Sequence, residues 1–132
     1  MATLSGKFPK TTGDKIYAQD IEQLRRIPQY STGTYVLSPL QVGQHVTVNG
    51  TIYVPTPLSG MQAGDAVTIY NPGSVSVNIA ASAGSNTAIY KLAGTTVVPT
   101  VLAANGLVTF LCVTSGGISS SPVYVVIGGG VS

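Results

Sequence analysis

Charge is scarce over most of this chain. Its 132 residues include six basic and four acidic side chains, and from residue 27 onward just Asp65 and Lys91 are charged. A globular domain normally has about a quarter of its residues charged, and a solvated surface relies on that charge to stay dispersed. A long uncharged stretch is therefore untypical of a free monomer. We expect its surface to be covered by copies of itself or by a partner.

Cysteine is equally scarce, because Cys112 is the single one and the chain has no tryptophan. No disulfide can form within one chain. A reactive thiol needs a basic neighbour that lowers its pKa, and the single histidine, His45, lies far away in sequence. We predict that Cys112 is a buried structural thiol.

Long apolar runs are missing too. No run approaches the roughly 18 residues that span a bilayer, and the first ten residues lack the apolar core of a secretory signal. We expect no membrane insertion and no export of the chain. The net charge of +2 is small, and the N-terminal cations alternate with acidic residues. We therefore expect no nucleic-acid partner.

The groups that build an active site are hard to find. The only acid after residue 26 is Asp65, in a Gly-Asp turn where aspartate commonly bonds its own backbone. A triad of His45, Asp65 and a serine can be imagined, but the chain has no Gly-x-Ser-x-Gly elbow. We predict no enzyme and no cofactor, and the alternative is a hydrolase that depends on His45 and Asp65.

A metal site has the same problem. One histidine, one cysteine and one acid in the body cannot supply a mixed four-ligand site within one chain. The remaining option is a symmetry axis on which three copies of His45 meet. We predict no metal.

What the chain does have is a charged N-terminal segment. Residues 1–13 read as an extended arm, and residues 14–27 as a helix that Asp14 caps and Pro28 stops. So short a helix must pack on another protein or on a symmetry mate. We expect residues 1–30 to form an arm and helix for attachment, with the helix contacts made by Ile16, Tyr17, Ile21, Leu24 and Arg25.

From Tyr35 onward the apolar pattern changes to a period of two. Seven or eight short alternating runs are separated by turn signals, and Asn49-Gly50 between two of them predicts a hairpin. The sequence predicts a mainly β fold over residues 31–132, an antiparallel β-sandwich or jelly-roll-like body or a small barrel. The glycine-rich end, residues 128–132, reads as a flexible tail.

Tyrosine is the one abundant aromatic residue, at seven positions. Tyrosine is favoured at interfaces because it combines apolar area with a hydroxyl group. Ordinary strand packing or a subunit interface explains most of these side chains. The alternative is contact with a ligand such as a glycan, through an exposed side chain of Tyr53, Tyr70 or Tyr90.

Several motifs resemble a β-domain of tailed-phage virion proteins. They are residues 42–55 (VGQHVTVNGTIYVP), 61–71 (MQAGDAVTIYN), 74–81 (SVSVNIAA), 107–111 (LVTFL) and 123–128 (VYVVIG), and residues 16–25 resemble the short helix that opens many phage fibre chains. Two positions depart from the pattern: Gln44 replaces a usual Lys or Arg, and Tyr124 replaces a usual Trp. These departures leave open tail fibre, head fibre and capsid decoration protein.

The resemblance implies a structural virion protein that is made in the cytoplasm of the host cell. We expect a short fibre or a capsid decoration protein that self-assembles through its β-body, as a trimer, and docks on capsid or tail proteins through residues 1–27. The alternative is an adhesin module of a tail fibre that binds a carbohydrate or another part of the host surface.

Overall fold

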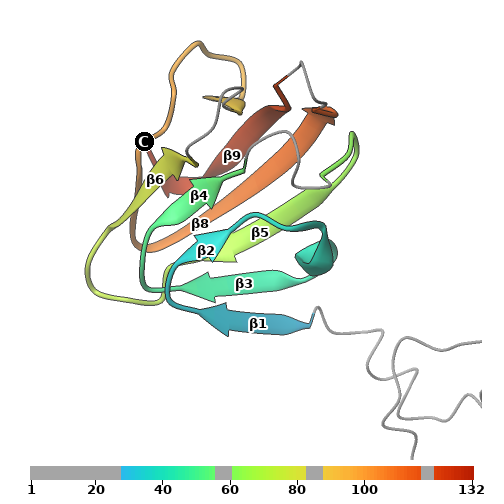
Figure 1. Cartoon of the computed structure of the whole chain (residues 1–132). Coiled ribbons are helices and arrows are strands. Elements are labelled where there is room, and N and C mark those ends of the chain that lie inside the picture. The colour runs from blue at the N-terminus through green and yellow to red at the C-terminus, as the bar shows by residue number, and fades with distance from the viewer. Residues whose placement is uncertain (1–27, 56–60, 83–87, 117–120) are drawn as a thin grey trace, which may run out of the picture.

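Short strands follow one another along the chain and stack into layers (Figure 1). The computed structural model describes residues 28–55, 61–82, 88–116 and 121–132. The elements in these ranges are β1 (Gln29–Thr32), β2 (Tyr35–Val36), the 3₁₀ helix η1 (Pro39–Gln41), β3 (His45–Val48), β4 (Ile52–Val54), β5 (Ala66–Tyr70), β6 (Val77–Ala81), β7 (Ile89–Leu92), β8 (Val101–Thr114) and β9 (Val123–Val131).

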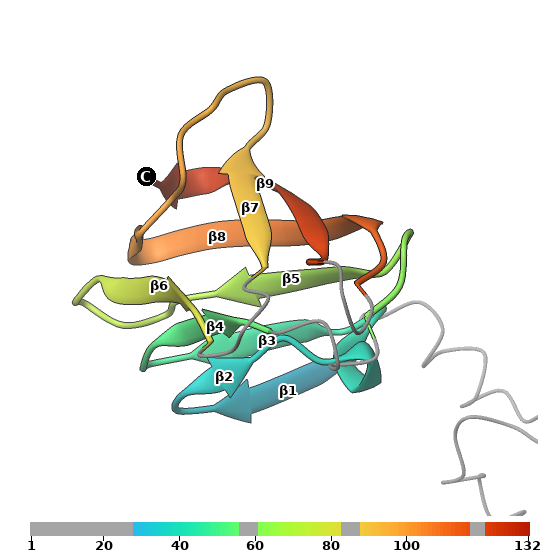
Figure 2. The ribbon, with the colours of Figure 1, turned by 45° about the horizontal axis from the view of Figure 1, so that its top comes forward.

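The first six strands alternate between two flanks of one wrapped sheet. Strands β1, β3 and β5 pair in parallel and form what we call the odd flank, and β2, β4 and β6 pair in parallel and form the even flank. Each odd strand and the even strand after it make one layer, and the layers stack in register (Figure 2). For example, Gln29 lies beside His45, which lies beside Thr68.

Strand β8 lies across both flanks as a fourth layer. Its first residues pair with β6 and its later residues pair with β5, in both cases antiparallel. Strand β9 pairs antiparallel with β8 as a fifth layer, and β7 pairs in parallel with β9. The chain bends within β8 at Asn105, whose φ is 59°, where the pairing with β9 shifts register between Leu102 and Leu107. The two flanks are thus joined through β8.

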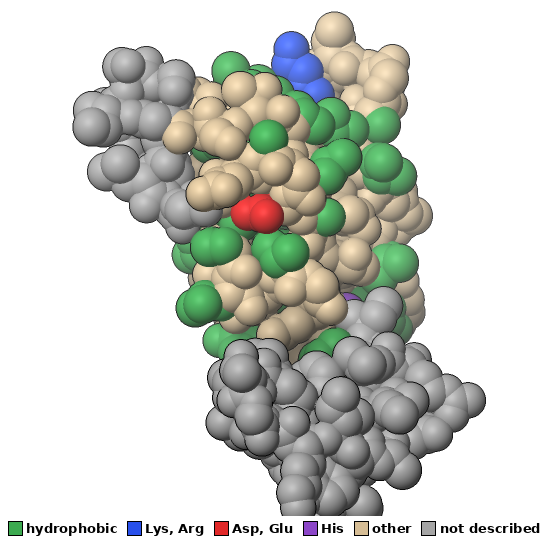
Figure 3. Space-filling model, turned by 90° about the vertical axis from the view of Figure 1, so that its right-hand side faces the viewer, with side chains coloured by type: hydrophobic (Ala, Val, Ile, Leu, Met, Phe, Trp, Pro, Cys, Tyr) green, Lys and Arg blue, Asp and Glu red, His purple; other side chains and the backbone are tan. Residues whose placement is uncertain are grey.

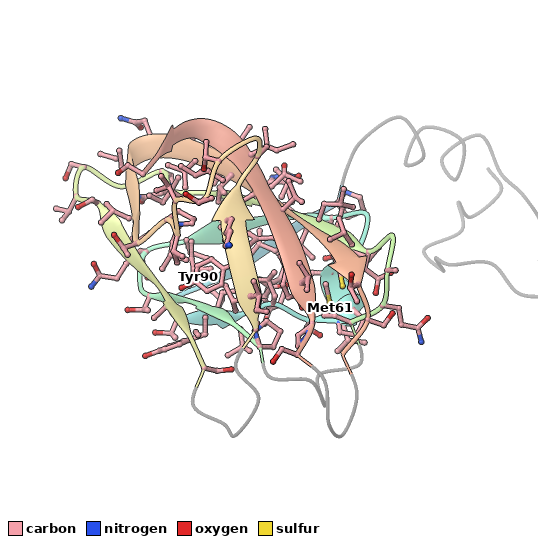
Figure 4. The ribbon with its side chains drawn as sticks, turned by 90° about the horizontal axis from the view of Figure 1, so that it is seen from above. Met61 and Tyr90 are labelled. Carbon is pink, nitrogen blue, oxygen red and sulfur yellow. The ribbon has the colours of Figure 1, made fainter. Side chains whose placement is uncertain are left out.

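One apolar core lies between the flanks. Inward and outward positions alternate along the core strands. Val46 and Val48 of β3 are 0% and 1% exposed, and Val108 and Phe110 of β8 are both 0% exposed. The same cluster contains side chains of the even flank, of β9 and of β7. Figure 4 shows two of its members, Tyr90 on β7 and Met61 in the connection that leads to β5.

A buried asparagine connects the third layer to the fourth. Asn71 follows β5 and is 0% exposed. Its side-chain amide donates to the carbonyl oxygens of Val75, at 2.9 Å, and Ala103, at 3.1 Å, and its Oδ1 accepts from the Gly73 N–H at 3.0 Å. Its own N–H donates to the carbonyl of Gly106 at 3.0 Å. A buried polar group of this kind is stable because its donors and acceptors are paired.

The predicted mainly β fold is confirmed, whereas a wholly antiparallel sandwich or jelly roll is not. Among the described residues, five strand pairs are parallel and three are antiparallel. The period-two pattern that predicts a half-buried strand is the same for both directions. The direction of pairing depends on where each connection leads the chain, which the pattern does not contain.

The predicted hairpin at Asn49-Gly50 is wrong. Strands β3 and β4 do not pair with each other, because β3 pairs with β1 and β5 while β4 pairs with β2 and β6. The hairpin turn needs positive φ at both residues, and neither has it. Gly50 instead packs against Gly33, in the connection between β1 and β2. Its N–H donates to the Gly33 carbonyl at 3.1 Å, and a Cβ on Gly50 would lie 3.1 Å from the Gly33 backbone.

The C-terminal end is also different from the predicted flexible tail. Strand β9 continues to Val131, and the Ser132 N–H donates to the Val101 carbonyl at 3.0 Å. Pairing with β8 orders this glycine-rich segment, which lacks the side-chain pattern of a strand.

The expected attachment arm and helix, with Ile16, Tyr17, Ile21, Leu24 and Arg25, lie outside the described residues. Strand β1 spans the expected boundary between residues 30 and 31. Within the described ranges, no helix is long and apolar enough to cross a bilayer.

Candidate functional site

The odd flank and the strands that continue it, β8, β9 and β7, present one long outer face. Its outward positions follow from the strand registers, and one row across the face runs Gln29, His45, Thr68, Thr109, Ile127. Lys91 of β7 is the single formally charged residue at the outward positions of these described strands. Figure 3 shows one side of the molecule, on which uncharged side chains predominate.

The part of this face that β1, β3 and β5 form is polar. Ser31 Oγ and Thr47 Oγ1 lie 2.7 Å apart, and the Gln29 side-chain amide donates to Thr47 Oγ1 at 3.3 Å. At the junction with β8, the hydroxyl oxygens of Thr68 and Thr109 lie 3.0 Å apart. Hydroxyl groups on neighbouring strands thus bond one another, which is a common way to stabilise cross-strand pairs.

The part that β8, β9 and β7 form is aliphatic. We call it the aliphatic face and define it by Ile89, Leu107, Leu111, Val125 and Ile127. Ile127 is 55% exposed, and Leu107 and Ile89 are 48% exposed. Thr109 and Lys91 are the polar outward residues within it. Contiguous apolar surface of this kind marks interaction sites more often than single exposed residues do.

A hollow of about 300 Å³ lies where β3 and β5 begin. Its walls come from the end of the connection after η1, from the turn before β5 and from the first residues of both strands. The lining residues are Val42, Gly43, Gln44, His45, Gly64, Ala66 and Thr68. They supply an imidazole, an amide, a hydroxyl and the apolar side chains of Val42 and Ala66, and no carboxylate.

The two residues of the imagined triad do not bond each other. Asp65 follows Gly64, but its Oδ2 accepts from the Gln62 N–H at 2.9 Å, as predicted for a turn aspartate. No hydrogen bond joins it to His45, which is half-buried and whose backbone N–H donates to the Pro28 carbonyl at 3.0 Å. The arrangement offers no nucleophile activated by a base, and the absence of enzyme activity stays a prediction.

Metal ligands do not gather in the part of the chain that the structure describes, since no group of three or more His, Cys, Asp or Glu side chains lies together there. Cys112 is 0% exposed, which confirms the predicted buried thiol. Burial raises its pKa above the ordinary value for a thiol, so that it is less nucleophilic than a free cysteine. A site shared by three copies of His45 stays an open prediction.

The three tyrosines singled out from the sequence do not come together. Tyr53 lies on the even flank beside Val36 and Ala80, and Tyr70 lies on the odd flank beside Leu107. Tyr90 is 7% exposed and belongs to the core, so it is not a surface residue. Its strand, Ile89–Leu92, has Lys91 on the opposite side, and that charge was the sequence signal that Tyr90 faces inward.

Another tyrosine, which the sequence did not single out, closes the core at the first layer. Tyr35 is 4% exposed, and its hydroxyl donates to Gln41 Oε1 at 3.1 Å and accepts from the Ser38 N–H at 3.2 Å. Its ring centroid lies 6.3 Å from that of Tyr30. Burial raises the pKa of Tyr35 to about 12, and the bond from Ser38 opposes that rise. Its place at the start of a predicted strand was the only signal.

No protein-family model and no curated protein matches the sequence of this chain.

Proposed function

We propose that this chain is a structural protein of a tailed-phage particle, either a short fibre or a capsid decoration protein. Its β-body, residues 31–132, would self-assemble, and residues 1–27 would dock on capsid or tail proteins. The observation that carries the proposal is the near absence of charge in the described part of the chain, where Asp65 and Lys91 are the only formally charged side chains. A surface with so little charge favours association.

The mechanism of such a protein is assembly. Each square ångström of apolar surface that copies of the body remove from water contributes about 25 cal/mol to association. In a trimer, three bodies would bury such surface around a three-fold axis. The charged N-terminal segment would give attachment that is specific and sensitive to salt, because charged groups steer and select partners more than they add affinity.

The alternatives have less support. A glycan site on an adhesin would act through exposed Tyr53, Tyr70 or Tyr90; of these, Tyr90 is buried, and Tyr53 and Tyr70 lie on different flanks. A hydrolase would need His45 and Asp65 to cooperate, and Asp65 bonds its own turn instead. No described feature favours either function over assembly.

Self-assembly is tested by the solution mass of the purified full chain, measured by light scattering at low and at high salt. We expect a trimer at both, because apolar burial is not screened by salt. A chain that stays monomeric at high protein concentration would contradict the proposal.

The place on a particle is tested with antibodies against this chain on purified phage from the source culture. We expect labelling of heads or tails. The variant Ile21→Asp should lose attachment and keep its self-assembly, and Val75→Asp, in the connection between β5 and β6, is the matched control that should keep both. Particles that are never labelled would contradict the virion proposal.

A further inference from the structure

We infer that the aliphatic face is the surface through which copies of this chain pack against one another. The inference rests on the proposed self-assembly and assigns it to one face. The occupant is a neighbouring copy of the chain: in the proposed trimer the aliphatic faces of three bodies meet around the three-fold axis, and each packs against the same face of its neighbours.

The first reason is that β8 is apolar on both of its sides. Val108 and Phe110 face the core, and Leu107 and Leu111 face outward. Strands with apolar side chains on both sides are typical of sheets that are covered on both faces. Strand β3 has the opposite pattern, with valines inward and His45 and Thr47 outward. The sequence of β8 therefore fits a strand with a cover on its outer side, and the described chain supplies none there.

The second reason is that this face has almost no charge and therefore fits an uncharged partner. Lys91 is its one formally charged residue and lies on β7, beside Val125. Nucleic acid needs many cations, and a charged protein surface would leave its own charges desolvated and unpaired against the aliphatic side chains. The same face of another copy brings aliphatic side chains to aliphatic side chains, and Lys91 can stay at the rim.

The third reason is that the polar group inside the face is already paired. A standard interface buries about 800 Å² on each partner, more than five side chains supply, so a second copy must also cover Thr109 and Tyr70. The hydroxyl of Thr109 bonds that of Thr68, at 3.0 Å. One of the two hydroxyls donates to the other, so covering Thr109 costs less than burying a hydroxyl that has no partner.

The test places a charge in the face and compares it with a charge elsewhere. Ile127→Glu would bury an unpaired carboxylate in the interface, and we expect at least ~100-fold weaker self-association of the full chain by light scattering. Val75→Glu is the matched control: Val75 is 72% exposed, lies between β5 and β6, and should keep the mass of the unmodified chain. Circular dichroism checks that both variants are folded.

The outcomes separate the face from the proposed function. An Ile127→Glu variant that is folded and keeps the full oligomeric mass would overturn the inference and leave self-assembly standing. An unmodified chain that is monomeric at high concentration would overturn both.

A thiol probe decides the question even if Ile127→Glu does not fold. Because Cys112 is buried and is the only cysteine, Ile127→Cys and Val75→Cys each introduce one accessible thiol. We expect maleimide to label Cys at position 127 at least ~10-fold more slowly than at position 75 in the assembled chain, and equally fast after dilution to monomer. Equal rates in the assembled chain would overturn the inference.

Discussion

Strands β3 and β8 have similar inner sides and different outer sides. Inward, Val46 and Val108 are both fully buried in the same core. Outward, β3 presents Thr47, which hydrogen-bonds Ser31, whereas β8 presents Leu107, which is 48% exposed. The core needs apolar side chains from both strands. The outer side chains differ because the first layers face water and the last layers, as we propose, face another copy of the chain.

Two junctions between layers also differ. At the corner between the third and fourth layers, the Asn71 side chain makes hydrogen bonds, whereas β8 and β9 approach so closely at Gly128 that a side chain there would overlap the backbone. The following substitutions compare the two sides of β8 and the two junctions.

The largest effect is expected for the two sides of β8. Phe110→Ala should lower the free energy of unfolding by about 3–5 kcal/mol, because it leaves a cavity in the core. Leu107→Ala, on the same strand, should cost much less in dilute solution, where its side chain is half exposed. Denaturant unfolding of both variants at low concentration measures the difference. Equal losses would mean that β8 is covered on both sides within one chain.

Asn71→Ala tests the polar corner. The substitution leaves the carbonyls of Val75 and Ala103 and the N–H of Gly73 without their bonds, and the free energy of unfolding should fall by about 2–3 kcal/mol. Asn78→Ala, at an exposed position of β6, is the matched control and should change it by less than about 0.5 kcal/mol. If the two variants are equally stable, the asparagine does not hold the third and fourth layers together.

Gly128→Ala tests the close contact between β9 and β8. A Cβ at Gly128 would overlap the carbonyl oxygen of Leu107, whereas a Cβ at Gly129 would meet nothing within 4 Å. We expect a loss of about 1–3 kcal/mol for Gly128→Ala and almost none for Gly129→Ala, measured by thermal unfolding. A tolerant Gly128 would mean that β8 and β9 separate there easily.

The smallest effect concerns the first layer at alkaline pH. The pKa of Tyr35 is about 12 in the folded chain and about 10 when unfolded, so its contribution is complete below pH 10 and is lost as the pH rises towards 12. We expect a loss of order 1–2 kcal/mol from this residue. Burial also raises the pKa of Tyr90, so the measured quantity is the difference between the unmodified chain and Tyr35→Phe. An unchanged pH profile in Tyr35→Phe would contradict the assignment.

The alternation of apolar residues was enough to predict most strands and their buried sides. Val46, Val48, Val67 and Ile69 stand at alternate positions and all face the core. It was not enough for the pairing, because a corner and a hairpin both need a short polar connection such as Asn49-Gly50. Strand β1 was missed because its residues, Gln29–Thr32, are mostly polar and exposed.

The candidate site was predicted less well than the fold. The shortage of charge pointed to a covered surface but not to which one. Leu107 and Ile127 become a surface only when β8 pairs with β9, and their strands are apolar at successive positions, which leaves the outward side undecided. Tyr90 was misplaced although Lys91, its neighbour in the strand, indicates the outward side.

The position of β8 across both flanks has a consequence for the order of folding. The third layer has no neighbour on its upper side until β8 arrives, and its partner residues are far along the chain, as Ala66 and Leu111 are. The side-chain amide of Asn71 likewise cannot bond the Ala103 carbonyl until β8 has been made. Non-local pairing of this kind slows folding. During synthesis, the first three layers should therefore leave the ribosome without their complete core, which forms only when the last third of the chain has been made.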